Sequence, residues 1–116
     1  MRDVRKLALM ILAPIATGWA IPAQAQTEFS GAGETSEIHC DGGSVHVEGA
    51  DNTLTIHGPC KSLSVAGASN RITITLAAQS AIRVEGADNE IRWSAPGAAR
   101  PKLSVTGAGN RVSRRP

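Results

Sequence analysis

The sequence predicts an all-β fold, a short right-handed parallel β-helix (a β-solenoid) of about five coils, in which the chain advances by roughly 18–21 positions per coil. The hexapeptide VEGADN occurs at 47–52 and again at 84–89, and the near-copies VAGASN and VTGAGN occupy 65–70 and 105–110. The asparagines that end these segments recur at spacings of 18, 19 and 21, a period typical of solenoid repeats. Apolar residues alternate on both sides of each segment, as in strands that bury one face. Equivalent strands should stack in parallel, because no repeat buries its apolar face alone.

Residues 1–25 predict a secretory signal peptide. A basic start, MRDVRK, precedes the apolar run LALMILAPIATGWAIPA and the small residues AQA at 23–25. This order is typical of an export signal, with cleavage expected before Gln26. The alternative is an uncleaved anchor, but Pro14 and Pro22 interrupt a run already short for a span of roughly 20 residues. We expect an exported chain, periplasmic or extracellular, with no membrane span after cleavage.

The remaining chain, 26–116, is expected to form one β-solenoid domain. Its first coil, 29–43, is degenerate, and regular coils follow over 44–113. In the first coil the segment FSGAGETSEI places Phe29 at the valine position of the repeat and Glu34 at the asparagine position. Glu34 keeps the phase of the repeat with the next asparagine, so this segment is interpreted as a fifth copy.

Each regular coil carries two apolar-x-apolar pairs, one before the Gly-Ala turn and one after its asparagine. Alternation with a period of two marks each pair as a strand with one buried face. The fourth copy offers Val112 and then Arg114, so its pattern fails at the last inward position. Right-handed coiling is favoured over a left-handed hexapeptide helix, because the apolar sites do not follow a hexapeptide period and parallel crossovers are usually right-handed. The predicted core consists of Val45, Val47, Leu54, Ile56, Leu63, Val65, Ile72, Ile74, Ile82, Val84, Ile91, Trp93, Leu103, Val105 and Val112.

The repeated Gly-Ala-x-Asn segment predicts a sharp corner with a ladder of stacked asparagines. Glycine supplies a permissive backbone, alanine keeps the corner small, and an asparagine amide both donates and accepts along the stack. A ligand or calcium turn is the alternative, but the third residue changes its chemistry (Asp51, Ser69, Asp88, Gly109) while the others recur in phase. The predicted ladder consists of Gly49, Gly67, Gly86, Gly107, Asn52, Asn70, Asn89 and Asn110.

The two cysteines, Cys40 and Cys60, both lie in the exported part and are predicted to form one disulfide that pins the first coil. Cys40 comes two positions after the inward Ile38, whereas Cys60 comes four positions after the inward Ile56. They would therefore meet at the bend between two coils, across a lateral offset and one rung of the stack. A free thiol pair or a pair of metal ligands is the alternative.

The V-x-G-A-x-N-x-I-x-I repeat, the cysteine pair and the export signal together resemble the bacterial secreted family catalogued as domain of unknown function 3060. The resemblance spans roughly 38–112. It implies a short solenoid-like domain. It brings no established activity and no catalytic residues.

His39 and His57 are the candidate metal-ligating residues, since each follows an inward isoleucine in successive coils and both should lie on one outer face. A zinc site takes three or four converging ligands, and His46 is expected on the other strand of the coil. Solvent-facing histidines are the favoured interpretation, and no metal or other cofactor is predicted. The alternative function is a cell-envelope glycan- or metal-binding protein that uses the His39/His57 face.

Catalysis and nucleic-acid binding are both disfavoured. Asp51 and Asp88 share a register, but the Ser69 coil separates them, and stacking brings no catalytic constellation together. The segment 1–25 holds three of the twelve basic side chains and one of the ten acidic ones, which leaves nine of each in 26–116. This part of the chain therefore lacks the basic excess of nucleic-acid binders. The sequence predicts a non-enzymatic exported structural or binding module.

Charge is unevenly distributed along the chain. The segment 26–59 holds six acidic side chains and no lysine or arginine, whereas the segment 91–116 holds six basic side chains and no acidic one. Because position in sequence is axial position in a solenoid, one end should be acidic and the other basic. This favours salt-sensitive head-to-tail self-association, or docking of the basic end on an anionic envelope component. The alternative is that the end charges keep open strand edges from pairing.

Overall fold

The computed structural model describes residues 26–115, and the predicted signal peptide lies outside the described residues. Eight β-strands and no helix make up the described part. Every strand pairing is parallel. The strands are β2 (Gln26–Ala32), β3 (Thr35–His39), β4 (Ser44–Ala50), β5 (Thr53–Ala68), β6 (Arg71–Ala87), β7 (Glu90–Ser94), β8 (Lys102–Ala108) and β9 (Arg111–Arg114).

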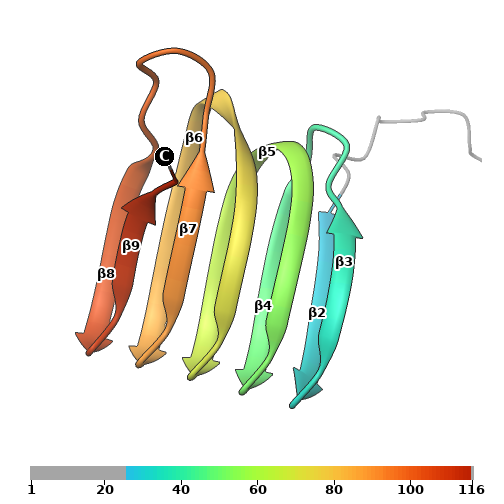
Figure 1. The fold of residues 1–116 in the computed structure, drawn as a ribbon, viewed down its shortest axis with the longest axis vertical. Coiled ribbons are helices and arrows are strands. Elements are labelled where there is room, and N and C mark those ends of the chain that lie inside the picture. Colours follow the sequence, from blue (N-terminus) through green and yellow to red (C-terminus); the bar gives the residue numbers. More distant parts are fainter. Residues whose placement is uncertain (1–25, 116) are drawn as a thin grey trace, which may run out of the picture.

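The strands wind into a solenoid of about five turns, so the predicted fold class is confirmed. One ladder runs through β2, β4, β5, β6 and β8, and the other through β3, β5, β6, β7 and β9. The long strands β5 and β6 belong to both ladders, because each bends at the top of its coil and continues on the opposite side (Figure 1). The turn that contains β2 and β3 forms one end of the stack, and β8 and β9 form the other (Figure 1).

The Gly-Ala corners stack directly on one another, from Gly31 in the first coil to Gly107 in the last. A side chain at Gly67 would overlap the carbonyl oxygen of Gly49 in the coil before, and the φ of Gly67 is +146°. Glycine is therefore required by both the close approach of the coils and the local backbone. The residue after the alanine is also left-handed, with φ of 61° at Asp51 and 58° at Ser69. This geometry explains why aspartate, serine and glycine alternate at that site, since short polar residues and glycine adopt it most readily.

The asparagines form a continuous hydrogen-bonded ladder inside the corners. The Nδ2 of Asn70 donates to Oδ1 of Asn89 in the next coil at 3.0 Å and to the carbonyl oxygen of Gly49 in the coil before at 3.0 Å. Its Oδ1 accepts from both Nδ2 and the backbone N–H of Asn52, at 3.0 and 3.2 Å. Asn52, Asn70 and Asn89 are buried, and these bonds satisfy their amides.

The inward strand positions form a single apolar core. Twelve of the fifteen predicted core residues are at most 4% exposed, and Val112 is half-buried against this core. Leu76 also belongs to the core, although the repeat pattern did not predict it. It continues the alternation of Ile72 and Ile74 by one more step, so the sequence did carry its signal.

The prediction is wrong for two core residues. Leu103 is 52% exposed and Val105 is 45% exposed, although both occupy the inward register of β8 beside the buried Ile82 and Val84. The cause is position in the stack: β8 is the last strand of its ladder, so no later coil covers it.

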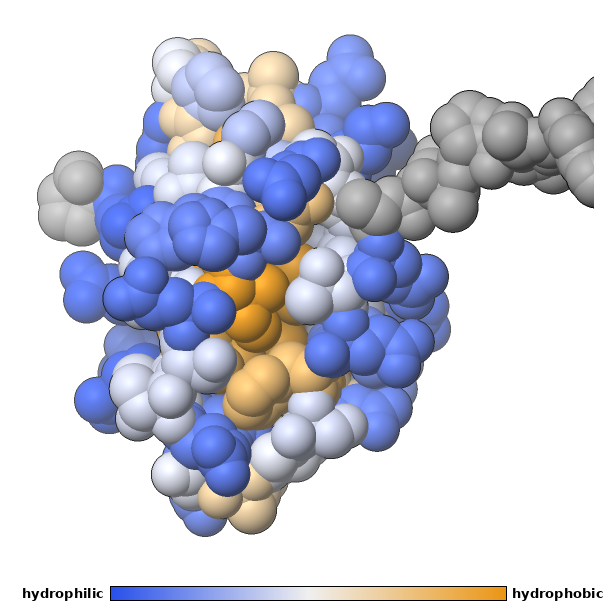
Figure 2. Space-filling view, turned by 90° about the vertical axis from the view of Figure 1, so that its right-hand side faces the viewer, coloured by the Kyte–Doolittle hydropathy of each residue, from blue (hydrophilic) through white to orange (hydrophobic). Residues whose placement is uncertain are grey.

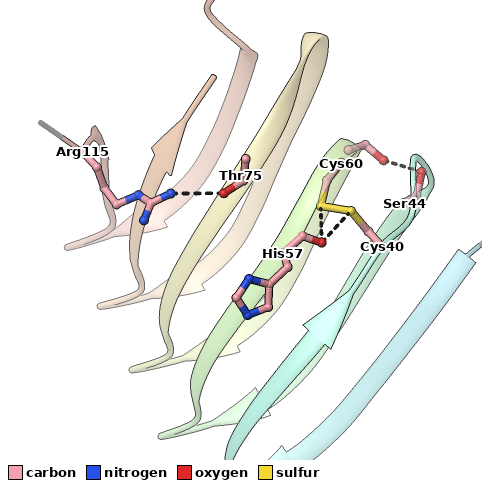
Figure 3. Close-up of a disulfide and its surroundings, with 7 residues drawn as sticks. Cys40, Ser44, His57, Cys60, Thr75 and Arg115 are labelled. Carbon is pink, nitrogen blue, oxygen red and sulfur yellow. Dashed lines mark hydrogen bonds between the residues drawn. A yellow bond between two sulfur atoms is a disulfide. The ribbon is translucent and has the colours of Figure 1, made fainter. Parts of the chain in front are cut away.

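Cys40 and Cys60 form a disulfide with a Cα–Cα distance of 5.6 Å, and both residues are buried. It links the bend that follows β3 to the middle of β5, next to the carbonyl group of His57 (Figure 3). The two cysteines are separated by 20 positions in the chain. On the chain-entropy model, closing a loop of this size contributes about 3 kcal/mol to stability. The bond therefore fastens the first coil to the second.

We expect Trp93→Ala to lower the free energy of unfolding by about 3–5 kcal/mol, because it leaves a cavity at a large buried side chain. Trp93 is 4% exposed. Denaturant unfolding of the oxidised protein measures the loss. The exposed Leu103 provides the control, and Leu103→Ala should cost much less. Equal losses for the two variants would contradict the burial of Trp93.

We expect Asn70→Ala to destabilise the fold by at least about 2 kcal/mol, because it leaves buried partners of the amide unsatisfied. Asn110→Ala is the matched control, since Asn110 stands at the half-buried end of the same ladder. Its loss should be clearly smaller in the same thermal or denaturant unfolding experiment. If the asparagines stabilised only their own corners, the two variants would lose similar amounts of unfolding free energy.

Candidate functional site

The structure brings His39 and His57 together on an outer face. They are paired residues of β3 and β5, and their rings stack with centroids 4.8 Å apart and planes 21° apart. The Nε2 of His57 lies 3.3 Å from Oε1 of Glu37. His46 lies on the other ladder, where its Nε2 is 2.8 Å from Oε2 of Glu48. The predicted histidine face therefore exists, with Glu37 as an additional member.

This face does not present a set of converging ligands. Stacked imidazoles turn their flat sides to each other, while their lone pairs lie in the ring planes and point elsewhere. Zinc sites need three or four ligands around one point. Within residues 26–115 no group of three or more histidine, cysteine, aspartate or glutamate side chains is placed to hold a metal ion.

The outer faces carry charged side chains in exposed pairs. Arg71 Nε lies 3.3 Å from Oε1 of Glu90 in the next coil, and Arg83 Nε lies 3.2 Å from Oε2 of Glu85 on the same strand. Such exposed pairs contribute little to stability. Asp51 and Asp88 occupy equivalent corners two coils apart, with Ser69 between them as predicted from the repeat. The lateral faces are thus regular and polar.

Two hollows lie near the C-terminal coils. One of about 250 Å³ is lined by Asp88, Asn89, Glu90, Gly109 and Arg111 at the asparagine corner. The other, of about 420 Å³, lies at the opposite bend, where Arg100 and Lys102 face Ser80. The Oγ atom of Ser80 is buried without a hydrogen-bond partner among the described residues. Both hollows are lined by polar groups of several kinds, and the second includes Ser80 together with the basic side chains of Arg100 and Lys102.

The C-terminal end of the solenoid is only half covered. On the β9 side, Arg114 occupies the inward register next to Trp93, where the sequence pattern fails. Its guanidinium lies over the Trp93 ring at 5.2 Å and donates to the carbonyl oxygens of Ala95 and Gly97 at 3.1 and 2.6 Å. This cation–π contact caps half of the end. On the other side all of β8 is exposed, including Leu103 and Val105.

At the N-terminal end, β2 and β3 are likewise the outermost strands of the part of the chain that the structure describes. Figure 2 shows an apolar patch at the centre of this end, ringed by hydrophilic side chains. Phe29 of β2 is half-buried against the core, and Ile38 of β3 is 8% exposed. Glu28, Glu34 and Glu37 are the exposed acidic side chains of the first coil up to β3. The two ends therefore share an apolar centre and differ in the charge around it.

The comparison with protein families gives one match, which lies within the repeats. A family model described as "Protein of unknown function (DUF3060)" matches residues 47–109. The chain belongs to this family. The match confirms the resemblance inferred from the repeat, and it starts and ends within the regular coils. Comparisons with curated proteins and with solved structures found no match.

The DUF3060 match covers regular coils of the repeat, and the family description assigns no activity. None of the described residues form a helix that is long and apolar enough to cross a membrane. The His39/His57 face and the two ends of the solenoid are the candidate functional regions, and the ends combine apolar exposure with charge.

Proposed function

We propose that the protein is an exported structural or binding module without catalytic activity, present in the periplasm or outside the cell. One observation carries this proposal: the repeated residues all make contacts that hold the coils together. The glycines permit close approach, the asparagines bond to one another, and the apolar pairs fill the core. The surfaces that can bind a partner are therefore the outer faces and the two ends of the solenoid.

Export is supported by two independent features. The order of basic, apolar and small residues over 1–25 is typical of a cleaved signal. The disulfide between Cys40 and Cys60 is of a kind that forms and persists in oxidising compartments. A small domain also benefits from such a covalent bond, because its core alone is marginal.

The absence of catalysis is proposed from how the charged groups are arranged. General acid–base or nucleophilic chemistry needs groups that converge on one substrate position. The carboxylates described here lie on exposed faces and corners, where several pair with a neighbouring arginine or histidine. The nearly balanced charge of 26–116 supports partners other than nucleic acid.

The alternative is a cell-envelope glycan- or metal-binding protein that uses the His39/His57 face. The stacked rings with Glu37 alongside favour it, because three polar side chains gather there. The geometry weighs against a metal, since the three do not surround one point. The structural role is therefore the preferred proposal.

Processing tests the export proposal. We expect the full chain, expressed in a bacterial host with its own leader, to be recovered outside the cytoplasm with Gln26 at its N-terminus. Intact-mass analysis should find it lighter than its reduced form by the two thiol hydrogens. Ala25→Arg is the control, because it removes the small residue before the cleavage point and should block processing. An unprocessed cytoplasmic chain with reduced cysteines would overturn the proposal.

A zinc titration separates the two proposals. A ligand that binds only the native state raises stability, by about 2.7 kcal/mol at a hundredfold excess over its dissociation constant. We expect zinc to leave the melting temperature of the oxidised protein unchanged. A rise that disappears in His57→Ala, while persisting in His46→Ala on the other ladder, would favour the metal-binding alternative instead.

A further inference from the structure

Building on the proposed structural role, we propose that copies of this chain stack head to tail, with β8 and β9 of one copy pairing in parallel with β2 and β3 of the next. The partner is a second copy of the same chain. Four features of the two ends carry the proposal: strand edges, the glycine corner, the polarity of the asparagine ladder, and charge.

Among the described strands, β8 and β2 end one ladder, and both strands run in the same direction (Figure 1). An exposed strand edge is a template for pairing with another chain. Continuing the registers of the ladder places Val105 beside Phe29 of the next copy and Leu103 beside Thr27. The contact would cover the two apolar side chains of β8 that the monomer leaves exposed.

The glycine corner continues to the N-terminal end of the stack, where Gly31 occupies its first position. In later coils the glycine is required because the carbonyl oxygen of the preceding glycine lies against it, as Gly31 does for Gly49. Among the described residues Gly31 has no such neighbour, and the atoms nearest to a Cβ placed there belong to the side chains of Glu34, Phe29 and Asn52. Stacking would place the carbonyl group of Gly107 from another copy against Gly31, in the same way that each later glycine lies against the carbonyl group of the glycine before it.

The asparagine ladder has a direction, and its two ends are complementary. Each asparagine donates from its backbone N–H and its Nδ2 to the Oδ1 of the next coil, as Asn89 does to Asn110 at 3.1 and 3.0 Å. Asn110 is the last member, so among the described residues no later asparagine accepts from its backbone N–H or its Nδ2. Its Nδ2 donates to Gly86 and turns back to the carbonyl oxygen of Thr106 at 3.4 Å.

At the other end the asparagine position holds Glu34, whose backbone N–H donates to Oδ1 of Asn52 at 3.0 Å. An ionised carboxylate only accepts hydrogen bonds, and such charge-assisted bonds are stronger than neutral ones. Glu34 is exposed in the monomer. In the proposed stack its carboxylate would accept from Asn110 of another copy, in place of the weak bond from Asn110 to Thr106.

The charges match in the same register. Glu37 would lie opposite Ser113 of the neighbouring copy, between Arg111 and Arg115 of β9 and its extension. Glu28 would lie opposite Ser104 and diagonal to Lys102. Among the described residues, no acidic side chain faces another across this contact, so the Coulomb attraction favours association and falls as salt rises.

Because the two surfaces differ, the contact is heterologous, and repeating it gives an open-ended filament rather than a closed dimer. We expect sedimentation velocity of the processed, oxidised protein to show species that grow with protein concentration. They should shrink between about 0.01 M and 1 M salt, where the Debye length falls from roughly 30 Å to roughly 3 Å. A closed dimer of fixed size, or a monomer under all these conditions, would overturn the proposal.

Two adjacent substitutions on β8 give a matched test. Val105→Lys puts a charge into the apolar centre of the contact, whereas Ser104→Lys puts the same charge on the outward side, opposite Glu28 of the next copy. We expect Val105→Lys to abolish association and Ser104→Lys to keep or strengthen it. Both sites are exposed, so circular dichroism melting should show both variants folded. Equal association of the two variants would overturn the proposed surface.

Glu34→Lys tests the ladder end, with Glu48→Lys on a lateral face as its control. Loss of association in Glu34→Lys alone is expected, and an equal loss in both would show only a general charge effect and overturn the ladder contact. A monomeric wild-type protein that binds anionic vesicles would likewise replace self-association with envelope docking. None of these outcomes bears on export or oxidation, which the processing experiment tests separately.

Discussion

The hydrogen bonds between stacked asparagine amides are the interaction on which the rest of the structure depends. A central amide such as that of Asn70 joins three coils, because it donates to Asn89 in one direction and to Gly49 in the other, and it accepts from Asn52. These bonds hold successive corners in one register, and that register sets the pairing of both ladders. With the corners aligned, every inward apolar pair falls on the pair of the coil before, which produces a continuous core.

The same constraint explains why the corners tolerate so little variation. Coils that lie this close leave no room for a Cβ at the repeated glycine, while the residue after the alanine must adopt a left-handed backbone. The long bend after β7 is freer. There Arg114 replaces an apolar residue, and it stabilises the bend by contacts with Trp93 and with the carbonyl groups of Ala95 and Gly97. The register shifts between β5 and β6 likewise lie on the side of the coil away from the asparagines.

In a stack of similar coils, the outermost coils present the same strand edges and apolar positions that inner coils use to pack against each other. Solenoids usually need atypical terminal repeats with a polar outer face to prevent further stacking. Here Arg114 covers half of the C-terminal end, while β8 still presents Leu103 and Val105. Opposite charges surround the two ends. The proposed self-association would form the same kinds of contact between copies that hold neighbouring coils together within the monomer: parallel strand pairing, apolar packing and hydrogen bonds at the asparagine position.

The coil length, the corner, the inward positions of the strands and the phase of the degenerate first coil could be predicted from the sequence, because these are local patterns that recur in every repeat. The cysteine pairing could also be predicted, from the presence of two cysteines and the expectation of export. Which inward residues are covered depends on the tertiary structure. Leu103 and Val105 have the same local pattern as Leu63 and Val65, yet they are exposed because burial in a solenoid depends on the following coil. The contact between Arg114 and Trp93 likewise arises only when the last turn folds back on the one before it, a proximity that no local pattern encodes.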